Sequence, residues 1–314
     1  MWGKTAYLLL FIFVILIALP VVLIKGILWK EKEAAIILKV YNHHQDKIVL
    51  LELEDYLRGV VAAEMPAKYH PEALKAQAVA ARTYTLQKLP AYGGTGSQAY
   101  PGADLSTDFR YCQAWLSQKE MKARWGFVAF FYYWARINNA VEETKGEVLS
   151  YQGDLIEAVY HANSGGYTEN AKDVWGGEKP YLISVESPYD QESKNYQSTF
   201  YIALQDVLNK LQIATQDNQW QLAITKTNDT GLVLEAKIAG QVFTGKELRE
   251  KLGLPSAKFT VTQQGDILAF QVLGKGHGVG MSQDGANGLA QLGYNYQEIL
   301  QHYYPNTMIS RLKK

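Results

Sequence analysis

Cysteine is almost absent from this chain of 314 residues, since Cys112 is its one example. A single cysteine excludes an internal disulfide and a cysteine-rich zinc module. Net charge is absent too, because 31 basic side chains balance 31 acidic ones. A neutral chain has no overall field that would attract nucleic acid or anionic lipid. We therefore expect recognition through local groups and no nucleic-acid partner.

Histidines with the spacing of a metal site are missing as well. His43 and His44 are adjacent, and His161, His277 and His302 are scattered along the chain. No pair of histidines stands at the i, i+3 or i+4 spacing that metal-binding helices use. We expect no metal and no other cofactor.

A long apolar run stands near the N-terminus. Residues 6–24 are 19 residues without a charge, and at about 1.5 Å each they nearly match the ~30 Å hydrocarbon thickness of a bilayer. A cleaved signal peptide has a shorter apolar core and a small-residue cleavage site, whereas residues 25–32 are bulky and Lys-rich. The sequence therefore predicts a transmembrane anchor with its flank over residues 1–32.

The charges beside this run favour a cytosolic body. Lys4 precedes the run, and Lys25, Lys30 and Lys32 follow it, so the positive-inside rule places the rest of the chain in the cytosol. The bias is small, and long domains translocate in spite of it. The function that the motifs indicate requires the body of the protein outside the cytosol, and we expect that orientation.

Strand and helix patterns are mixed along residues 33–314. Pro66 ends one helical pattern and Pro71 opens the next. Residues 121–140 fit either a buried helix or a strand. The other expected elements are strands at 35–40 and 47–52, helices at 53–63 and 71–88, hairpins at 147–151 with 156–161 and 259–264 with 267–273, and a second lobe within 198–272, where Thr244 caps a helix. Without regular βαβ alternation, the pattern predicts an α+β fold.

One candidate for acid catalysis stands at a helix end. Glu64 closes the apolar run 60–63, where burial and the negative end of the helix dipole both raise the pKa of a carboxyl group. A general acid near neutral pH needs such a raised pKa. Lys75 and Arg82 are seven residues apart, so both project from one face of the next helix and offer a basic surface for substrate. The alternative is a solvated basic stripe and a glutamate paired with an arginine.

A second segment, residues 159–170, contains a serine and a histidine. Ser164 as nucleophile with His161 as base would suit acyl transfer. The Gly-x-Ser-x-Gly elbow is absent, however, because NSGG lacks the leading glycine. Two adjacent glycines more simply let the backbone approach a ligand closely.

A third segment, residues 274–288, is rich in glycine and invites a dinucleotide-binding interpretation. The spacing fails, since Gly276 and Gly278 would need a third glycine where Met281 stands. A ligand loop that exposes His277 fits the segment better. A lone histidine of this kind is also often a hydrogen-bonded structural residue.

Together these segments resemble the stage II sporulation protein D family, peptidoglycan lytic transglycosylases related to amidase enhancers. The matching stretches are residues 53–84, 161–190 and 276–290, which span most of the chain after the anchor. The most specific part is GVVAAEMP at 59–66 followed by ALKAQAVAARTY at 73–84. The resemblance implies a mixed helix and strand catalytic region with a substrate groove.

The resemblance also implies roles for particular residues. The family's catalytic glutamate falls on Glu64, and its functional lysine and arginine fall on Lys75 and Arg82. His161, Ser164 and His277 would line the groove as substrate-binding residues. Ordinary glycosidases use two carboxyl groups, whereas a lytic transglycosylase uses the C6 hydroxyl of the muramic sugar as nucleophile and leaves 1,6-anhydro-muramic ends.

The same resemblance implies a setting. The substrate would be peptidoglycan glycan strands, cleaved in sporulation and engulfment. A cell-wall amidase that removes peptides and other membrane-anchored sporulation proteins are the expected partners. The chain would be a single-pass cell-membrane protein whose catalytic region, residues 33–314, is extracytoplasmic. The alternative is an amidase enhancer that binds peptidoglycan without cutting it.

Two positions depart from the family pattern. Asp284 stands where the family usually carries an aromatic residue, which would alter sugar stacking or add a second carboxylate. Some members carry a His/Cys zinc site near the equivalent of residues 108–113. Here Cys112 remains, but Tyr111 stands where a histidine is expected and no second cysteine exists, which argues against zinc.

Overall fold

The computed structural model describes residue 13 and residues 35–214 and 222–312. The predicted anchor, residues 1–32, lies outside the described residues except for residue 13. Among the described residues, no helix is both long and apolar enough to span a bilayer. The chain divides into two compact units, Met1–Ile37 and Leu38–Lys314, and the second unit contains all three motif segments.

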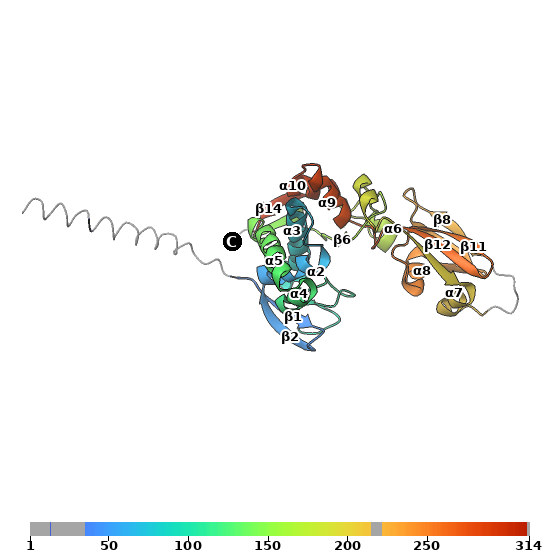
Figure 1. The fold of residues 1–314 in the computed structure, drawn as a ribbon, viewed down its shortest axis with the longest axis horizontal. Coiled ribbons are helices and arrows are strands. Elements are labelled where there is room, and N and C mark those ends of the chain that lie inside the picture. Colours follow the sequence, from blue (N-terminus) through green and yellow to red (C-terminus); the bar gives the residue numbers. More distant parts are fainter. Residues whose placement is uncertain (1–12, 14–34, 215–221, 313–314) are drawn as a thin grey trace, which may run out of the picture. The chain divides into compact units, whose positions relative to one another are not determined.

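Helix α3 (Pro71–Lys88) is the central helix of this second unit, and its bounds match the prediction. It contacts α2 (Leu53–Glu64) and α5 (Phe127–Glu143), as Figure 1 shows, and also β4 (Glu147–Tyr151), α9 (Gln283–Gln291) and α10 (Tyr296–Tyr303). Pro71 opens α3, and the side chain of His70 caps it by accepting from Glu72 N. Its alanines are buried on several faces. Because their side chains are small, many elements can approach this one helix closely.

Residues 121–140, which fitted either a helix or a strand, are helical. Helix α4 (Gln118–Trp125) begins at a capping box between Ser117 and Glu120. Gly126, with φ of 76°, separates α4 from α5. A positive φ suits glycine because it has no Cβ to clash with the backbone, so this residue sets the break between the two helices.

The described strands form five small sheets. Their strand orders are β2-β1-β3, β14-β4-β5, β13-β6, β11-β12-β7 and β10-β9-β8. The strands are β1 (Ile37–Asn42), β2 (Lys47–Glu52), β3 (Leu105–Ser106), β4 (Glu147–Tyr151), β5 (Asp154–Leu155), β6 (Tyr160–His161), β7 (Gln197–Ala203), β8 (Leu222–Thr227), β9 (Val233–Ile238), β10 (Gln241–Phe243), β11 (Phe259–Gln264), β12 (Ile267–Leu273), β13 (Met281–Ser282) and β14 (Met308–Arg311). The remaining helices are α6 (Ala171–Trp175), α7 (Leu204–Leu211), α8 (Gly245–Leu252), α9 (Gln283–Gln291) and α10 (Tyr296–Tyr303), with short 3-10 turns η1 (Pro90–Tyr92) and η2 (Pro188–Glu192). The fold is α+β, as predicted.

One predicted hairpin is wrong in its second strand. Strand β4 turns through Gln152 and Gly153, both at positive φ, and pairs with β5, which ends at Leu155. The predicted partner 156–161 instead leaves the hairpin, and its end becomes β6, which pairs in parallel with β13. This pairing places His161 opposite Ser282 and brings two of the motif segments together.

A separate hydrophobic core lies in the region where the second lobe was predicted. It gathers side chains of α7, α8 and strands β9, β11 and β12, including Val207, Leu248 and Phe270. Thr244 caps α8 as predicted, in a capping box with Glu247. The predicted hairpin of β11 and β12 has the predicted bounds.

Candidate active site

Glu64 is the last residue of α2, and the chain leaves the helix at once. Met65 is extended, with φ of −122° and ψ of 139°, as a residue before proline favours. The Glu64 side chain is half-buried, and its Oε1 accepts from the backbone N–H of Ala114 at 2.7 Å. No described cation forms an ion pair with it. The alternative of a glutamate locked to an arginine is therefore absent from the described residues.

The pKa of Glu64 is raised to about 7, in the predicted direction. Burial is the main cause, and hydrogen bonds from Ala114 N–H and the Gln283 side chain act against it. At neutral pH the carboxyl group is therefore present in both forms. A group that first donates and then accepts a proton in one reaction requires that balance.

The segment that supplies the Ala114 N–H lies directly on α2. Leu116 N donates to Gly59 O at 3.1 Å. A Cβ at Gly59 would come within 2.1 Å of the indole Nε1 of Trp115, so a larger residue would push this segment away. Gly59 in the GVVAAEMP motif thus allows the close approach that delivers the N–H of Ala114 to Glu64.

Two glutamines connect this segment and Glu64 to the rest of the unit. Gln113 accepts from Tyr160 OH at 2.7 Å and donates to Thr85 Oγ1 at 2.9 Å. Gln283, which opens α9 and contacts Glu64, donates to Gln77 Oε1 at 3.1 Å. Neither glutamine nor Ala114 is among the site residues that the sequence predicts. A backbone donor leaves no signal in a sequence, because every residue except proline has one.

Lys75 and Arg82 share a face of α3, as predicted, but that face points away from Glu64. Lys75 Nζ pairs with Glu72 and Glu143, both at 2.7 Å. Gln77, which faces the Glu64 side through Gln283, follows Lys75 by two residues, about 200° around the helix. The structure therefore does not bring Lys75 together with Glu64.

Arg82 is fully buried and has structural partners. Its guanidinium contacts both oxygens of Glu54, at 3.0 and 2.6 Å, and donates to the backbone oxygens of Glu147 and Val141. These bonds tie α2 to the end of α5 and to β4. The placement favours a structural role for Arg82 over the predicted contact with substrate.

His161 and His277 lie together, with ring centroids 5.5 Å apart. His161 is buried, and its Nδ1 lies 3.1 Å from Val279 O. His277 is half-buried, and the exposed Trp175 lies beside it at 5.1 Å. Burial lowers the pKa of both, to about 4 for His277, so both rings are neutral at pH 7 and act through hydrogen bonds or stacking.

Ser164 belongs to a buried network that does not include His161. Its backbone N–H donates to Asp190 Oδ2 at 2.8 Å, and its hydroxyl donates to the same oxygen. Ser282 Oγ donates to Asp190 Oδ1 at 2.6 Å. Burial raises the pKa of Asp190. A serine held by an aspartate in this way lacks the adjacent base that acyl transfer needs.

Asp284, which departs from the family pattern, is buried and surrounded by side chains that donate hydrogen bonds to it. It accepts from Asn163 and Asn195 at 3.0 and 3.1 Å and from the hydroxyl of Tyr69. These bonds join the start of α9 to three loops. The geometry favours a structural role for this carboxylate rather than that of a second catalytic group.

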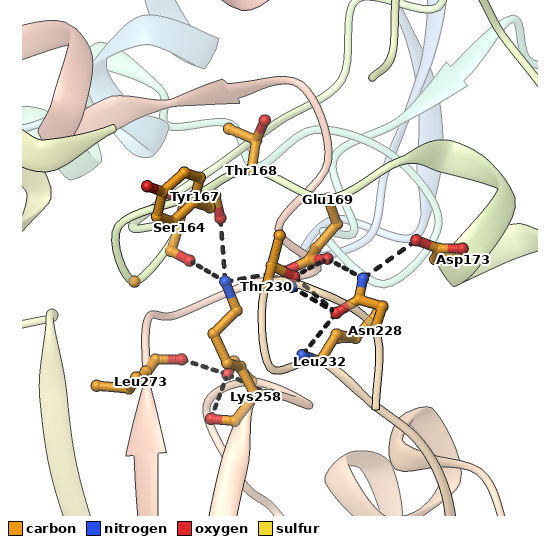
Figure 2. Close-up of polar contacts among 12 residues, drawn as sticks. Ser164, Tyr167, Thr168, Glu169, Asp173, Asn228, Thr230, Leu232, Lys258 and Leu273 are labelled. Atoms are coloured by element: carbon orange, nitrogen blue, oxygen red, sulfur yellow. Dashed lines mark hydrogen bonds and ion pairs between the residues drawn. The ribbon is translucent and has the colours of Figure 1, made fainter. Parts of the chain in front are cut away.

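A buried ion pair connects the loop at residues 161–170, which we call the HANSGG loop, to the hydrophobic core of α7, α8, β9, β11 and β12, which we call the second core, as Figure 2 shows. Lys258 Nζ lies 2.9 Å from Glu169 Oε1 and donates to the backbone oxygens of Ser164 and Tyr167, both at 3.1 Å. Glu169 also accepts from Asn228 and Thr230. Three segments far apart in the sequence therefore meet at one carboxylate.

The two described cavities lie away from Glu64. One, of about 240 Å³, is lined by Lys75, Arg136 and Glu143 among others, and the second, of about 350 Å³, borders Tyr111 and Cys112. The predicted groove at Glu64 is not among them. Within the described residues, no three His, Cys, Asp or Glu side chains are arranged to hold a metal ion.

Comparison with known proteins decides the family. A family described as "Stage II sporulation protein" matches residues 41–151. The chain is 37% identical over 279 residues to stage II sporulation protein D of Bacillus subtilis (strain 168), covering 89% of this chain and 80% of the relative. The chain belongs to the stage II sporulation protein D family. A member from Bacillus amyloliquefaciens is 39% identical over 281 residues, with the same coverage.

A further relative has a different name. The amidase enhancer of Bacillus subtilis (strain 168) is 31% identical to the chain, over 81% of this chain and 40% of that protein. The family match at 41–151 contains Glu64, Lys75 and Arg82. The resemblance read from the motifs is therefore confirmed.

Proposed function

We propose that this protein is a peptidoglycan lytic transglycosylase in which Glu64 is the single acid and base. The observation that carries the proposal is the state of Glu64, which is half-buried, has no ion-pair partner among the described residues and has a pKa of about 7. A purely structural glutamate at a helix end does not require a raised pKa. A general acid that works near neutral pH needs it.

The reaction follows from one carboxyl group. Protonated Glu64 donates its proton to the glycosidic oxygen as the bond from the muramic C1 breaks. The resulting carboxylate, stabilised by Ala114 N–H, then takes the proton of the C6 hydroxyl while that oxygen bonds to C1. The products are a 1,6-anhydro-muramic end and a new glycan end with a free hydroxyl, and Glu64 has its proton again.

The other predicted residues contribute unequally. Half-buried His277 beside exposed Trp175 supports a contact with sugar. Lys75 borders the 240 Å³ cavity, where its ammonium would bind glycan by exchanging its pair with Glu72 or Glu143 for a carboxylate of the substrate. For His161, Ser164 and Arg82 the burial supports an indirect role, in which they hold the loops and helices that carry the site.

The setting is part of the proposal. Residues 6–24 would anchor the chain in the cell membrane as a single pass, with residues 33–314 outside the cytoplasm, where peptidoglycan lies. A cell-wall amidase that strips peptides from the strands would be the partner reaction. The relative named amidase enhancer supports that link, and it also supports the rival function of binding glycan without cutting it.

Mass spectrometry of digested glycan strands tests the proposal. The native protein is expected to release 1,6-anhydro-muramic products, and Glu64→Gln to release none. Glu178→Gln is the matched control, because Glu178 is exposed and pairs only loosely with Lys172 at 3.6 Å. Glycan binding without any anhydro product from the native protein would favour the amidase-enhancer alternative.

A further inference from the structure

Helix α5 exposes an apolar stripe where a surface helix normally exposes polar residues. The side chains of Phe127, Val128, Phe131 and Tyr132 are 71, 85, 55 and 61% exposed. They stand at i, i+1, i+4 and i+5, so they share one face of the helix. We call these four residues the aromatic stripe. Contact with an apolar partner would remove the apolar surface of these four side chains from water, which is favourable.

The stripe ends part-way along the helix. Beyond Ala135, the exposed positions of α5 are Asn139, Glu142 and Glu143, which are polar. The large apolar side chains are thus exposed only in the first half of α5, next to α4. A contiguous exposed patch of this kind marks an interaction surface more often than chance exposure.

Basic side chains lie on α4, the helix that precedes the aromatic stripe and packs against α5. Lys119, Lys122 and Arg124 of α4 are exposed, and no described carboxylate lies within ion-pair distance of any of them. Lys122 Nζ lies 5.0 Å from the ring of Phe130, which stacks edge-on against Phe131. Residues 121–141 contain no acidic residue. Helix α4 therefore exposes three cations beside one carboxylate, that of Glu120, which is bound to Ser117 at the start of the helix.

We propose that the aromatic stripe and the three α4 cations dock onto the surface of an anionic lipid bilayer. Aromatic side chains are enriched where headgroups meet acyl chains, and lysine and arginine nearby attract anionic lipid. The two features occur together here on adjacent helices. The predicted anchor at 6–24 would hold the chain beside such a bilayer.

The ring geometry favours lipid over sugar. Phe127 and Phe131 are at 84° to each other, so they do not form a common flat platform on which a sugar ring could stack. Three of the four side chains, Phe127, Val128 and Phe131, also offer no hydrogen bond to a hydroxyl group, and the Tyr132 hydroxyl already accepts one from Arg136. The boundary between headgroups and acyl chains accepts rings in any orientation.

Depth-dependent fluorescence quenching tests the docking on the full-length protein. Cys112→Ser removes the native thiol, and Val128→Cys then carries an environment-sensitive dye in vesicles of equal parts phosphatidylglycerol and phosphatidylethanolamine. The matched control places the dye at Val242→Cys in β10, which is 60% exposed. Acyl-chain doxyl lipid is expected to quench the dye at 128 about twofold and the dye at 242 little.

Two further arms make the result decisive. Reversal of the three α4 cations to glutamate, or raised salt, is expected to weaken quenching at 128, while glycan cleavage stays unchanged as the sign of an intact fold. Equal quenching of the dyes at 128 and 242 would overturn the proposal. So would quenching at 128 that stays the same after charge reversal and in raised salt. So would a dye at 128 that responds to purified glycan strands and not to lipid.

Discussion

The backbone N–H of Ala114 donates to Oε1 of Glu64 across 2.7 Å. A segment fifty residues away in sequence thus contributes the bond that steadies the proposed catalytic carboxylate. Burial raises the pKa of Glu64 and this bond restrains the rise. The balance leaves a group that can lose and regain a proton near pH 7.

Replacing Glu64 by glutamine is expected to stabilise the protein at alkaline pH. The unfolded state ionises Glu64 above its ordinary pKa of 4.5, whereas the folded state does so only above about 7. Folding stability therefore falls as pH rises between these values and stays lower above them. Urea unfolding is expected to show Glu64→Gln more stable by about 1–3 kcal/mol near pH 8 and nearly equal to the native protein near pH 4. A native protein as stable as the variant near pH 8 would show that burial does not perturb Glu64.

Removing the amide of Gln283 is expected to move the pH profile of cleavage. Its hydrogen bond lowers the pKa of Glu64, so Gln283→Leu raises that pKa further. Protonated Glu64 then persists to higher pH, and the alkaline limb of initial rate against pH shifts upward. Gln297→Leu, at an exposed position of α10, is the control and should leave the limb in place. A lower rate with an unmoved limb would make Gln283 a structural residue only.

Arg82→Met is expected to cost about 3–5 kcal/mol of unfolding free energy, because it leaves Glu54 without its partner in a mostly buried site. The double variant Arg82→Met with Glu54→Met should recover much of that loss, since no unpaired charge remains. Urea unfolding measures both. A fully stable Arg82→Met protein that no longer binds glycan would instead support the predicted contact with substrate.

Lys258→Met is expected to destabilise the protein by a similar amount, about 3–5 kcal/mol, because Glu169 is 1% exposed and loses its cation. Lys172→Met breaks an exposed pair with Glu178 and should cost less than about 1 kcal/mol. Thermal and urea unfolding of the two variants compare them directly. Similar losses in both would mean that the contact drawn in Figure 2 does not hold the HANSGG loop to the second core.

Much of the fold follows from local sequence signals. Pro71 and the Ala-rich pattern predict α3 to the residue, and Thr244 predicts the start of α8. The strand at 160–161 could not be predicted to pair with 281–282, because parallel pairing between distant segments has no local signal. Residues 121–140 were ambiguous because aromatic residues suit a buried strand as well as a helix.

The candidate site was predicted in part. The position of Glu64 at an apolar helix end correctly indicated a raised pKa. Helical spacing placed Lys75 and Arg82 on one face but could not say which element that face meets, and it meets Glu143 and the end of α5. Ala114 acts through its backbone, and Gln283 acts through a contact between helices, so only tertiary structure brings them to Glu64.

Digestion of purified glycan strands in water enriched in ¹⁸O tests the central claim most directly. If the C6 hydroxyl and not water attacks C1, the cleaved muramic end contains no oxygen from the solvent. Mass spectrometry is expected to find unlabelled 1,6-anhydro ends from the native protein and from Glu178→Gln, and none from Glu64→Gln. Labelled reducing ends in excess of those in a sample incubated without the protein, or anhydro ends that persist in Glu64→Gln, would contradict the account.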